Sequence, residues 1–404
     1  MSTSVARQFR SWLGVLGPGM ITAALVFGPS KVTITSKLGA DFGFDLLWII
    51  VVAIFFMIVF TAMAARIGMA SDVSFLTIIR IKWGKAAAIA TGVGVFLVAA
   101  SFQAGNSIGI GISIAELFDS TPAPWIIGFN LFGISLLFFR SFYKVLEKIM
   151  IGLIIIMLVS FLVTLFLSKP PIVALAAGLV PAIPTGSFAL VIAFMASCFS
   201  IVGACYQSYL MQERKRTYPG GRQSPRDSFP GILILGIMSA IVLICAAAVL
   251  HPKDLPVNSG SDMARVLEPL FGSYASVFFL IGLFGAAFSS LIGNASLGGT
   301  LMGDALGFGS SFRSKRVRGL IALVMTIGAI IAIVFGSLPI RLMIFAQSIT
   351  ILVVPFIGIA LYLIANDESI MKDLKNSTQV KIFGALGLLI LIGLAIRNVQ
   401  TLFF

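Results

Sequence analysis

A short stretch at residues 28–31, Gly-Pro-Ser-Lys, interrupts the first apolar segment of this chain. Residues 22–27 are apolar and helical in character, and the apolar pattern resumes at 32–38. Proline lacks an N–H and clashes with the preceding turn, so a helix cannot pass cleanly through Pro29. In a bilayer, unpaired backbone is tolerated only where it is buried in protein or lines a water-filled cavity. The stretch predicts a discontinuous transmembrane helix with a polar site near the bilayer midplane, as in many secondary transporters.

Lys31 gives this break its chemical interest, because a lysine within a membrane span is costly and marks a functional site by default. In one reading, its ammonium binds an anionic group of a substrate. In a second, it stands in for a coupling cation, holds the two half-helices as Na⁺ would, and couples transport to protons through its own protonation. In a third, the side chain snorkels or packs inertly.

A second apolar span, at residues 186–210, is also interrupted, because the stretch 200–208 lowers its hydrophobicity in the middle. The two interrupted spans are five spans apart. An odd offset inverts direction across the membrane, so the pattern predicts two inverted repeats with one broken helix each. Broken helices in corresponding positions of two repeats indicate where a transporter binds its substrate.

The composition sets the class of protein. Hydrophobic residues make up 59% of the chain and charged residues 11%, whereas soluble domains carry about 25% charged residues. The chain is therefore predicted to be a polytopic membrane protein. Its net charge of +13 follows membrane topology and does not indicate nucleic-acid binding. The three cysteines lie in apolar spans without metal-like spacing, and no nucleophile–base set or phosphate loop is present, so we expect neither an enzyme nor a cofactor.

Eleven apolar segments are each near the roughly 20 residues that a bilayer requires. An inside N-terminus places 21 of the 28 Lys and Arg residues on inner segments and five on outer ones. This bias predicts a cytoplasmic N-terminus and, with an odd number of spans, an outside C-terminus. The expected spans are 12–39, 44–66, 86–117, 123–139, 146–168, 186–210, 229–250, 273–300, 317–336, 339–365 and 379–401.

The spans form a single transmembrane domain over residues 1–404. Repeat one is expected over about 12–168 and repeat two over about 186–365, and the span at 379–401 is an extra helix. The predicted location is the cell (inner) membrane.

Ten short segments carry a motif pattern in collinear order: 17–20, 28–31, 42–48, 65–68, 143–147, 288–290, 298–300, 346–347, 370–372 and 382–384. Together they resemble the NRAMP (natural resistance-associated macrophage protein) family of proton-coupled divalent-metal transporters. The resemblance covers nearly the whole chain and implies an all-α, LeuT-like fold, a 5+5 inverted repeat with discontinuous helices 1 and 6 and about 11 transmembrane helices.

The family's functional positions have changed in this chain. Its first-span motif Asp-Pro-Gly-Asn corresponds to residues 28–31, Gly-Pro-Ser-Lys. Its sixth-span motif Met-Pro-His corresponds to residues 207–209, Gln-Ser-Tyr. The acidic pair of its third span aligns with Gln103 and Asn106, which do not titrate. The backbone carbonyl near Ala204 and the amide of Gln347 keep the family's type.

Charge argues against the family's own metal site. Every one of the fifteen acidic residues lies in a predicted loop or near a span end. Divalent ions prefer anionic oxygen, thioether or imidazole ligands, according to their hardness, and the two breaks present an ammonium instead. At an effective dielectric of about 20, a dication about 4–6 Å from Lys31 is repelled by several kcal/mol.

The sequence thus predicts an NRAMP-like secondary transporter working by alternating access, carrying a small neutral or anionic solute with Lys31 at its central site. Two alternatives stay open, a divalent-metal transporter with a rebuilt site and a non-transporting receptor or scaffold. The expected partners are the bilayer and a small solute or ion, with proton coupling as one of the readings of Lys31; the oligomeric state is open. The candidate substrate-binding residues are Gly28, Ser30, Lys31, Ala204, Tyr206, Gln207 and Gln347, and the candidate pathway or coupling residues are Lys31, Gln103, Asn106 and Tyr209.

Overall fold

The computed structural model describes residues 17–139, 142–220, 224–255, 257, 273–335 and 340–403, and within these ranges it leaves out the side chains of 17, 273, 275, 340–349 and 401–403. The described residues are helical and include no β-strand. The long helices are α2 (Gly17–Val26), α3 (Pro29–Phe42), α4 (Leu47–Ala70), α5 (Phe75–Leu117), α6 (Pro122–Leu136), α7 (Phe142–Ser168), α9 (Phe188–Cys198), α10 (Ile201–Thr217), α11 (Phe229–Val249), α13 (Ser273–Ala305), α14 (Lys315–Phe335), α15 (Ile340–Ala365) and α17 (Thr378–Phe403), and the short ones are α8 (Ile172–Ala177) and α16 (Glu368–Met371).

These helices agree with the expected spans. Within the described residues, eight helical segments are long and apolar enough to cross a bilayer, with α9 and α10 counted as one. α15 and the segment after it form one further, bent span. The shorter α6 and the α2–α3 pair occupy the remaining two expected positions. The prediction of a discontinuous first and sixth span is confirmed, because α2 stops before α3 and α9 stops before α10.

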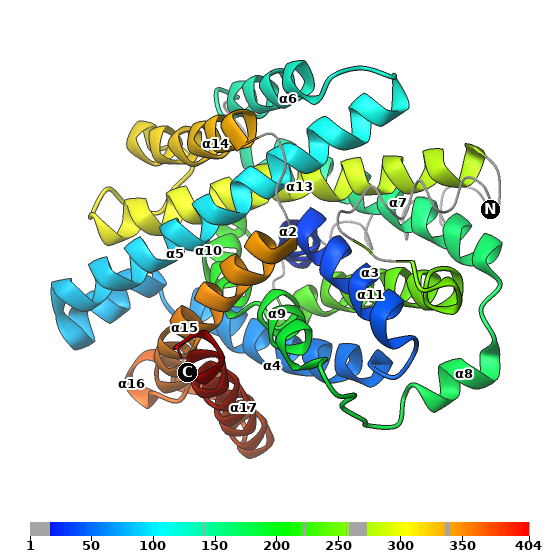
Figure 1. Ribbon diagram of the computed structural model, residues 1–404. Coiled ribbons are helices and arrows are strands. Elements are labelled where there is room, and N and C mark those ends of the chain that lie inside the picture. Colours follow the sequence, from blue (N-terminus) through cyan, green and yellow to red (C-terminus); the bar gives the residue numbers. More distant parts are fainter. Residues whose placement is uncertain are drawn as a thin grey trace, which may run out of the picture.

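The two repeats pack against each other in a reciprocal way. The second half of each broken helix packs on the helix that follows the other broken helix, so that α10 lies against α4 and α3 lies against α11. The third helices of the two repeats, α5 and α13, pack along each other and cross above α2 in Figure 1. The extra helix α17 packs against α15 at the edge of the bundle.

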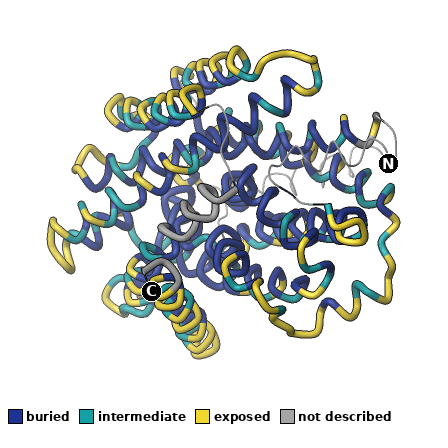
Figure 2. Tube along the Cα trace, in the orientation of Figure 1, coloured by how far each residue is buried: buried dark blue, intermediate teal, exposed yellow. Residues whose placement is uncertain are grey.

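Burial follows the same plan. Figure 2 shows the broken helices at the buried centre, while α6, α14 and α17 present exposed faces at the periphery. Exposed side chains on these outer helices are large and apolar, such as Leu131, Val334 and Leu389, which suits contact with lipid. The half-helices α2 and α9 are apolar on all sides, as expected for helices surrounded by protein.

α5 is longer than the expected span 86–117 because it continues back to Phe75 through a break at Gly84. Gly84 has a φ of 89°, in the region that glycine adopts without a steric penalty. The segment before this break meets the ends of α4, α10 and α13. We call this part of the molecule the basic end, because it carries Arg80, Lys82 and Lys215.

Candidate functional site

The first break is built from residues that end one helix and start another. Pro29 occupies the first position of α3, where a missing N–H costs nothing and its fixed φ suits a helix. Gly28 precedes it with an extended backbone and provides no capping side chain. Pro29 packs closely on α5, because a Cβ added to Gly109 would lie 2.4 Å from the Pro29 Cγ. The break is therefore held against the third span.

Gly28 leaves little room for the family's aspartate. A Cβ at residue 28 would lie 2.8 Å from the Ser290 Oγ and 3.1 Å from the Asn106 Oδ1. Ser290 is fixed in turn, because its hydroxyl contacts the carbonyls of Ala24 and Leu25 at 3.1 and 3.0 Å. A side chain at this position therefore requires the Ser290 hydroxyl to break these contacts and its neighbours to move by a few tenths of an ångström, so the surroundings fit the glycine that this chain has there.

The second break lies slightly before the stretch from which it was predicted. The unwound residues are Phe199 and Ser200, and the polar stretch 200–208 is largely helical within α10. The Ser200 Oγ accepts a hydrogen bond from the Gly203 N–H at 3.2 Å and so caps α10. Ala204 lies inside α10, and its N–H bonds the Ser200 carbonyl at 2.8 Å. Its carbonyl thus points along a helix and not into the unwound segment.

A cavity of about 50 Å³ lies between the two breaks and is bordered by α5, α13 and α15. At about 15 Å³ for each water-sized position, it has room for roughly three water molecules. Four of the predicted residues, Gly28, Ser30, Lys31 and Asn106, line it together. The remaining polar lining residues are Ser197, Ser200, Asn294 and Thr350.

Lys31 is the exceptional residue of this cavity. Its side chain is 1% exposed, and its Nζ forms no ion pair and no hydrogen bond of regular geometry with any residue that the structure describes. The Cys198 thiol lies near it and is a weak acceptor. It lies 4.7 Å from the centre of the Phe194 ring. A cation–π contact contributes about 0.5–2 kcal/mol, whereas burial costs an ion several kcal/mol. The ring alone therefore does not compensate a buried ammonium.

The cavity contains no anionic group among its described lining residues. Over the described part of the chain, no cluster of three or more His, Cys, Asp or Glu side chains is placed to hold a metal ion. The ligand set that the structure shows around the breaks consists of hydroxyls, one ammonium and the amides of Asn106 and Asn294.

The backbone carbonyls at the end of α2 already have partners. The hydroxyls of Ser289 and Ser290 on α13 each lie within hydrogen-bonding distance of the Ala24 carbonyl, at 3.0 and 3.1 Å. The Asn294 amide donates to the Leu25 carbonyl at 3.2 Å. In transporters with broken helices, such carbonyls commonly coordinate a cation. Here side chains of α13 already occupy them.

Two predicted glutamines point away from the cavity. The Gln103 side chain donates to the Leu291 carbonyl at 2.8 Å and packs against Gly328 on α14, so it joins α5 to two neighbours. The Gln207 Oε1 accepts a hydrogen bond from the Thr22 hydroxyl at 2.6 Å, which ties α10 to α2. Neither residue is part of the described cavity lining. Gln347 is outside the residues whose side chains are described.

The two predicted tyrosines also lie away from the cavity. Tyr206 is fully buried, and its ring stacks on that of Tyr209 at 6.4 Å. Tyr209 is at the basic end, where its hydroxyl donates to Asp304 at 2.6 Å and accepts from the Leu76 N–H at 3.1 Å. Its position indicates a contact between helices and not a contact with a ligand in the cavity.

Asp304 is the centre of a polar network at the basic end. Its side chain is 3% exposed and accepts hydrogen bonds from Tyr209, from the Ser74 hydroxyl at 2.7 Å and from the Thr77 hydroxyl at 3.1 Å. Arg80 donates to the backbone carbonyl of the same residue at 3.4 Å. The network joins α5, α10 and α13.

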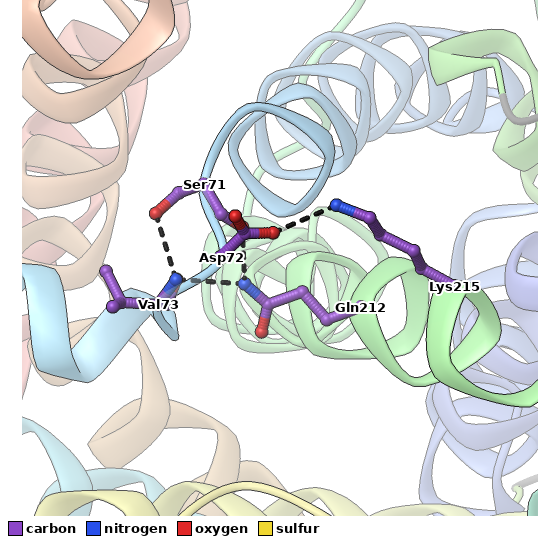
Figure 3. Close-up of polar contacts among 5 residues, drawn as sticks. All are labelled: Ser71, Asp72, Val73, Gln212 and Lys215. Atoms are coloured by element: carbon purple, nitrogen blue, oxygen red, sulfur yellow. Dashed lines mark hydrogen bonds and ion pairs between the residues drawn. The ribbon is translucent and has the colours of Figure 1, made fainter. Parts of the chain in front are cut away.

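Figure 3 shows the continuation of this network along α10. Gln212 donates to the carbonyls of Ser71 and Val73 at 3.0 and 2.8 Å, and Lys215 forms an ion pair with Asp72 at 2.9 Å. The Lys215 ammonium holds the pKa of the Asp72 carboxyl below its ordinary value. The positions 209, 212 and 215 recur every three residues, so one face of α10 carries all these contacts.

Sequence reasoning missed three residues: Asp304 at the basic end, and Phe194 and Ser197 at the cavity. Asp304 had a usable signal, because it is an acidic residue in a long apolar segment close to a basic stretch. Phe194 and Ser197 had none, since they are ordinary residues of an apolar half-helix.

The comparisons with known proteins fit this geometry. Residues 19–401 match the family described as natural resistance-associated macrophage protein-like. The chain is 25% identical to the divalent metal cation transporter MntH of Erwinia tasmaniensis, over 97% of this chain and 96% of the relative. A manganese transporter of Eremococcus coleocola superposes with a TM-score of 0.76 at 18% identity, over 97% of this chain and 87% of that one. MhsT in complex with L-phenylalanine superposes with a TM-score of 0.62 at 14% identity, over 93% and 98%.

These likenesses confirm the predicted all-helical, LeuT-like transporter fold with its two broken helices, and they confirm a multi-pass membrane transporter in place of an enzyme. The chain belongs to the natural resistance-associated macrophage protein (NRAMP) family.

Proposed function

We propose that this protein is a secondary transporter that works by alternating access around the cavity between its two broken helices. The observation that carries the proposal is Lys31, a buried ammonium without a described partner, at the wall of this cavity. A buried charge is costly unless it is paired, so an unpaired lysine between two helix breaks fits a site that receives its partner from outside. The NRAMP membership of the chain supports transport as the activity.

The cargo that the cavity chemistry favours is a small neutral or anionic solute. The described lining residues provide hydroxyls, amides and one ammonium, and they include no carboxylate. An anionic or strongly polar group can accept hydrogen bonds from Lys31, whereas a cation there is repelled by it. Lys31 also gives a route for proton coupling, if the amine releases its proton during the cycle.

A divalent metal ion is the second candidate, and the relatives favour it more directly than they favour a small solute. They are named as divalent metal cation or manganese transporters over almost the full length of this chain. For this candidate, Lys31 has to become a neutral amine in the metal-bound state, and the ligands have to come from hydroxyls, amides and backbone. Such a set is weak for manganese or iron, which favour anionic oxygen or imidazole.

We place the N-terminus on the cytoplasmic side and the C-terminus outside, so that the basic end faces the cytoplasm. The positive-inside rule supports this assignment. Reporter fusions at Ser2 and Phe404 are expected to show opposite sides of the membrane. Two fusions scored on the same side contradict it.

Transport by purified protein in liposomes tests the proposed function. The panel contains Mn²⁺, halides, small carboxylates, amino acids and nucleobases, each with and without a pH gradient. We expect uptake of a neutral or anionic member that Lys31→Met abolishes, while Lys37→Met, at a partly exposed position of the same helix, leaves uptake unchanged. Saturable micromolar Mn²⁺ uptake lost in Gly28→Ala or Lys31→Met establishes the metal candidate instead. Lys31→Arg separates charge from proton release, because a guanidinium keeps its proton.

A further inference from the structure

We propose that the cavity between the two breaks binds a small monovalent inorganic anion of the halide class, held directly by the Lys31 ammonium. This inference deepens the proposed function, on which it rests for the role of the cavity, by naming the chemical class of its ligand. Three features of the cavity support it: its charge, the balance of its free donors and acceptors, and its size.

The charge of the cavity is unbalanced by one. Lys31 carries three N–H donors, and among the described residues they meet no oxygen acceptor, but only the nearby thiol of Cys198, whose sulfur is a weak acceptor. The nearby Phe194 ring offers its π face but no negative charge. Since no described lining residue is acidic, the compensating charge for an ammonium has to come from a bound ligand. One ammonium balances one negative charge, which selects a monovalent anion.

Backbone carbonyls at the two breaks already accept hydrogen bonds, while the start of α3 offers backbone N–H groups. The carbonyls that end α2 accept hydrogen bonds from Ser290 and Asn294, and the carbonyl of Met195 near the end of α9 accepts one from the Phe199 N–H at 2.8 Å. In contrast, α3 starts at the cavity with no side chain capping it. The first N–H groups of a helix and its dipole both attract an anion. A cation finds the opposite arrangement, with its natural ligands occupied.

The size of the cavity limits the ligand further. About 50 Å³ admits a halide with one or two water molecules but not an amino acid or a nucleobase. The hydroxyls of Ser30 and Ser200 line the same space and can donate to a spherical anion from different directions, whereas the Ser197 hydroxyl already donates to the Phe194 carbonyl at 2.9 Å.

Chloride-35 NMR line broadening on the purified full-length protein tests this site without requiring transport. Sodium chloride is titrated at constant ionic strength, with sodium gluconate as the balancing salt. We expect saturable broadening for the native protein and for Lys37→Met, whose lysine lies on α3 in a surface ion pair with Asp41. Lys31→Met is expected to bind at least tenfold more weakly. Ala196→Val, which narrows the cavity and keeps Lys31, is expected to weaken binding several-fold and serves if Lys31→Met does not fold.

Two outcomes overturn the proposal. Equal broadening in all variants assigns the chloride to surface sites, and no saturable broadening in the native protein shows that Lys31 carries no bound halide. Competition of chloride with bromide and with formate separates a halide site from a carboxylate site. A halide site is expected to lose chloride more readily to bromide than to formate. Stronger displacement by formate contradicts the halide assignment. Chloride binding without any transport refutes the transporter proposal and keeps the anion site, whereas transport of another solute without chloride binding does the reverse.

Discussion

The central cavity and the basic end differ in how far their buried charges are satisfied. At the basic end, the Asp304 carboxylate accepts hydrogen bonds from three hydroxyls on two other helical segments. In the cavity, the Lys31 ammonium has an aromatic ring and the Cys198 thiol as described neighbours and no hydrogen bond of regular geometry. The two side chains are similarly buried, at 3% and 1% exposed. Burial alone therefore does not show whether a charge is satisfied by the protein; its partners do.

This difference separates two tasks in the transporter. The network around Asp304 joins α10, part of a broken helix, to α5 and α13, so it stabilises the contact of these helices at one end of the molecule. The cavity keeps a charged group without a protein partner, which lowers stability and leaves the group available to a ligand. The same kind of substitution should therefore have opposite effects on stability in the two regions.

Lys31→Met gives the largest functional effect and the clearest reversal in stability. We expect transport to be lost entirely, while the free energy of unfolding stays the same or rises by about 1–3 kcal/mol, because an unsatisfied buried donor group is removed. Thermal unfolding in detergent and chloride-free buffer, followed by tryptophan fluorescence, measures the second effect without stabilisation by the anion proposed above. Lys37→Met is the matched control and should change neither quantity. A marked fall in the melting temperature of Lys31→Met would show that Lys31 has a structural partner.

Asp304→Asn gives the largest loss of stability. The amide keeps the shape but loses the negative charge that strengthens the hydrogen bonds from Tyr209, Ser74 and Thr77. We expect a loss of about 2–3 kcal/mol, in the range for hydrogen bonds to a buried charge. Asp373→Asn, at an exposed position, serves as control. If the two variants melt at the same temperature, the network does not stabilise the basic end.

Several parts of this contrast could be predicted from the sequence. The first break follows from Pro29, because its missing N–H and fixed φ act in any context. The second break was predicted from the polarity of residues 200–208, but this stretch largely forms a helix and the unwound residues lie at its start. A capped and well-packed helix tolerates Ser, Gly and Gln, so polarity reveals an interruption more reliably than its position.

The direction of individual side chains could not be predicted in the same way. Gln103 and Asn106 are three residues apart on α5, yet only Asn106 lines the cavity, while Gln103 reaches the backbone of α13. Which face of a buried helix meets which neighbour depends on tertiary packing. The distance of Tyr209 from the second break, however, could have been worked out from the sequence. Tyr209 follows Ser200 by nine residues, and a rise of 1.5 Å per residue places it about 14 Å along the helix. It therefore belongs to the basic end.

Gln212→Ala tests the middle of the contact face on α10. Gln212 is 6% exposed and donates to two carbonyls in the connection between α4 and α5. Removing it leaves these carbonyls without that donor, and we expect a loss of about 1–2 kcal/mol. Hydrogen exchange should rise locally in residues 71–77, and not around the cavity. Gln379→Ala, at an exposed position of α17, is the control, and an equal change in both variants contradicts the role of Gln212.

Lys215→Met is expected to give the smallest effect, because its ion pair with Asp72 lies at the surface, with side chains 56% and 93% exposed. Water and salt screen such pairs, so the melting temperature of Lys215→Met should fall by less than that of Gln212→Ala.

The pH dependence of this ion pair has a definite sign. The pKa of Asp72 is lowered by Lys215 in the folded protein, so the contribution of the pair is fully present above the ordinary pKa of aspartate, about 4. It is lost as the pH falls through the lowered pKa of the folded state. The melting temperatures of native protein and variant should therefore converge at acid pH, and also at high salt at neutral pH. A difference that persists under both conditions would mean that the apolar stem of Lys215 packs on α10 or its neighbours. Apolar contact, and not the ion pair, would then account for the contribution of Lys215 to the stability of the basic end.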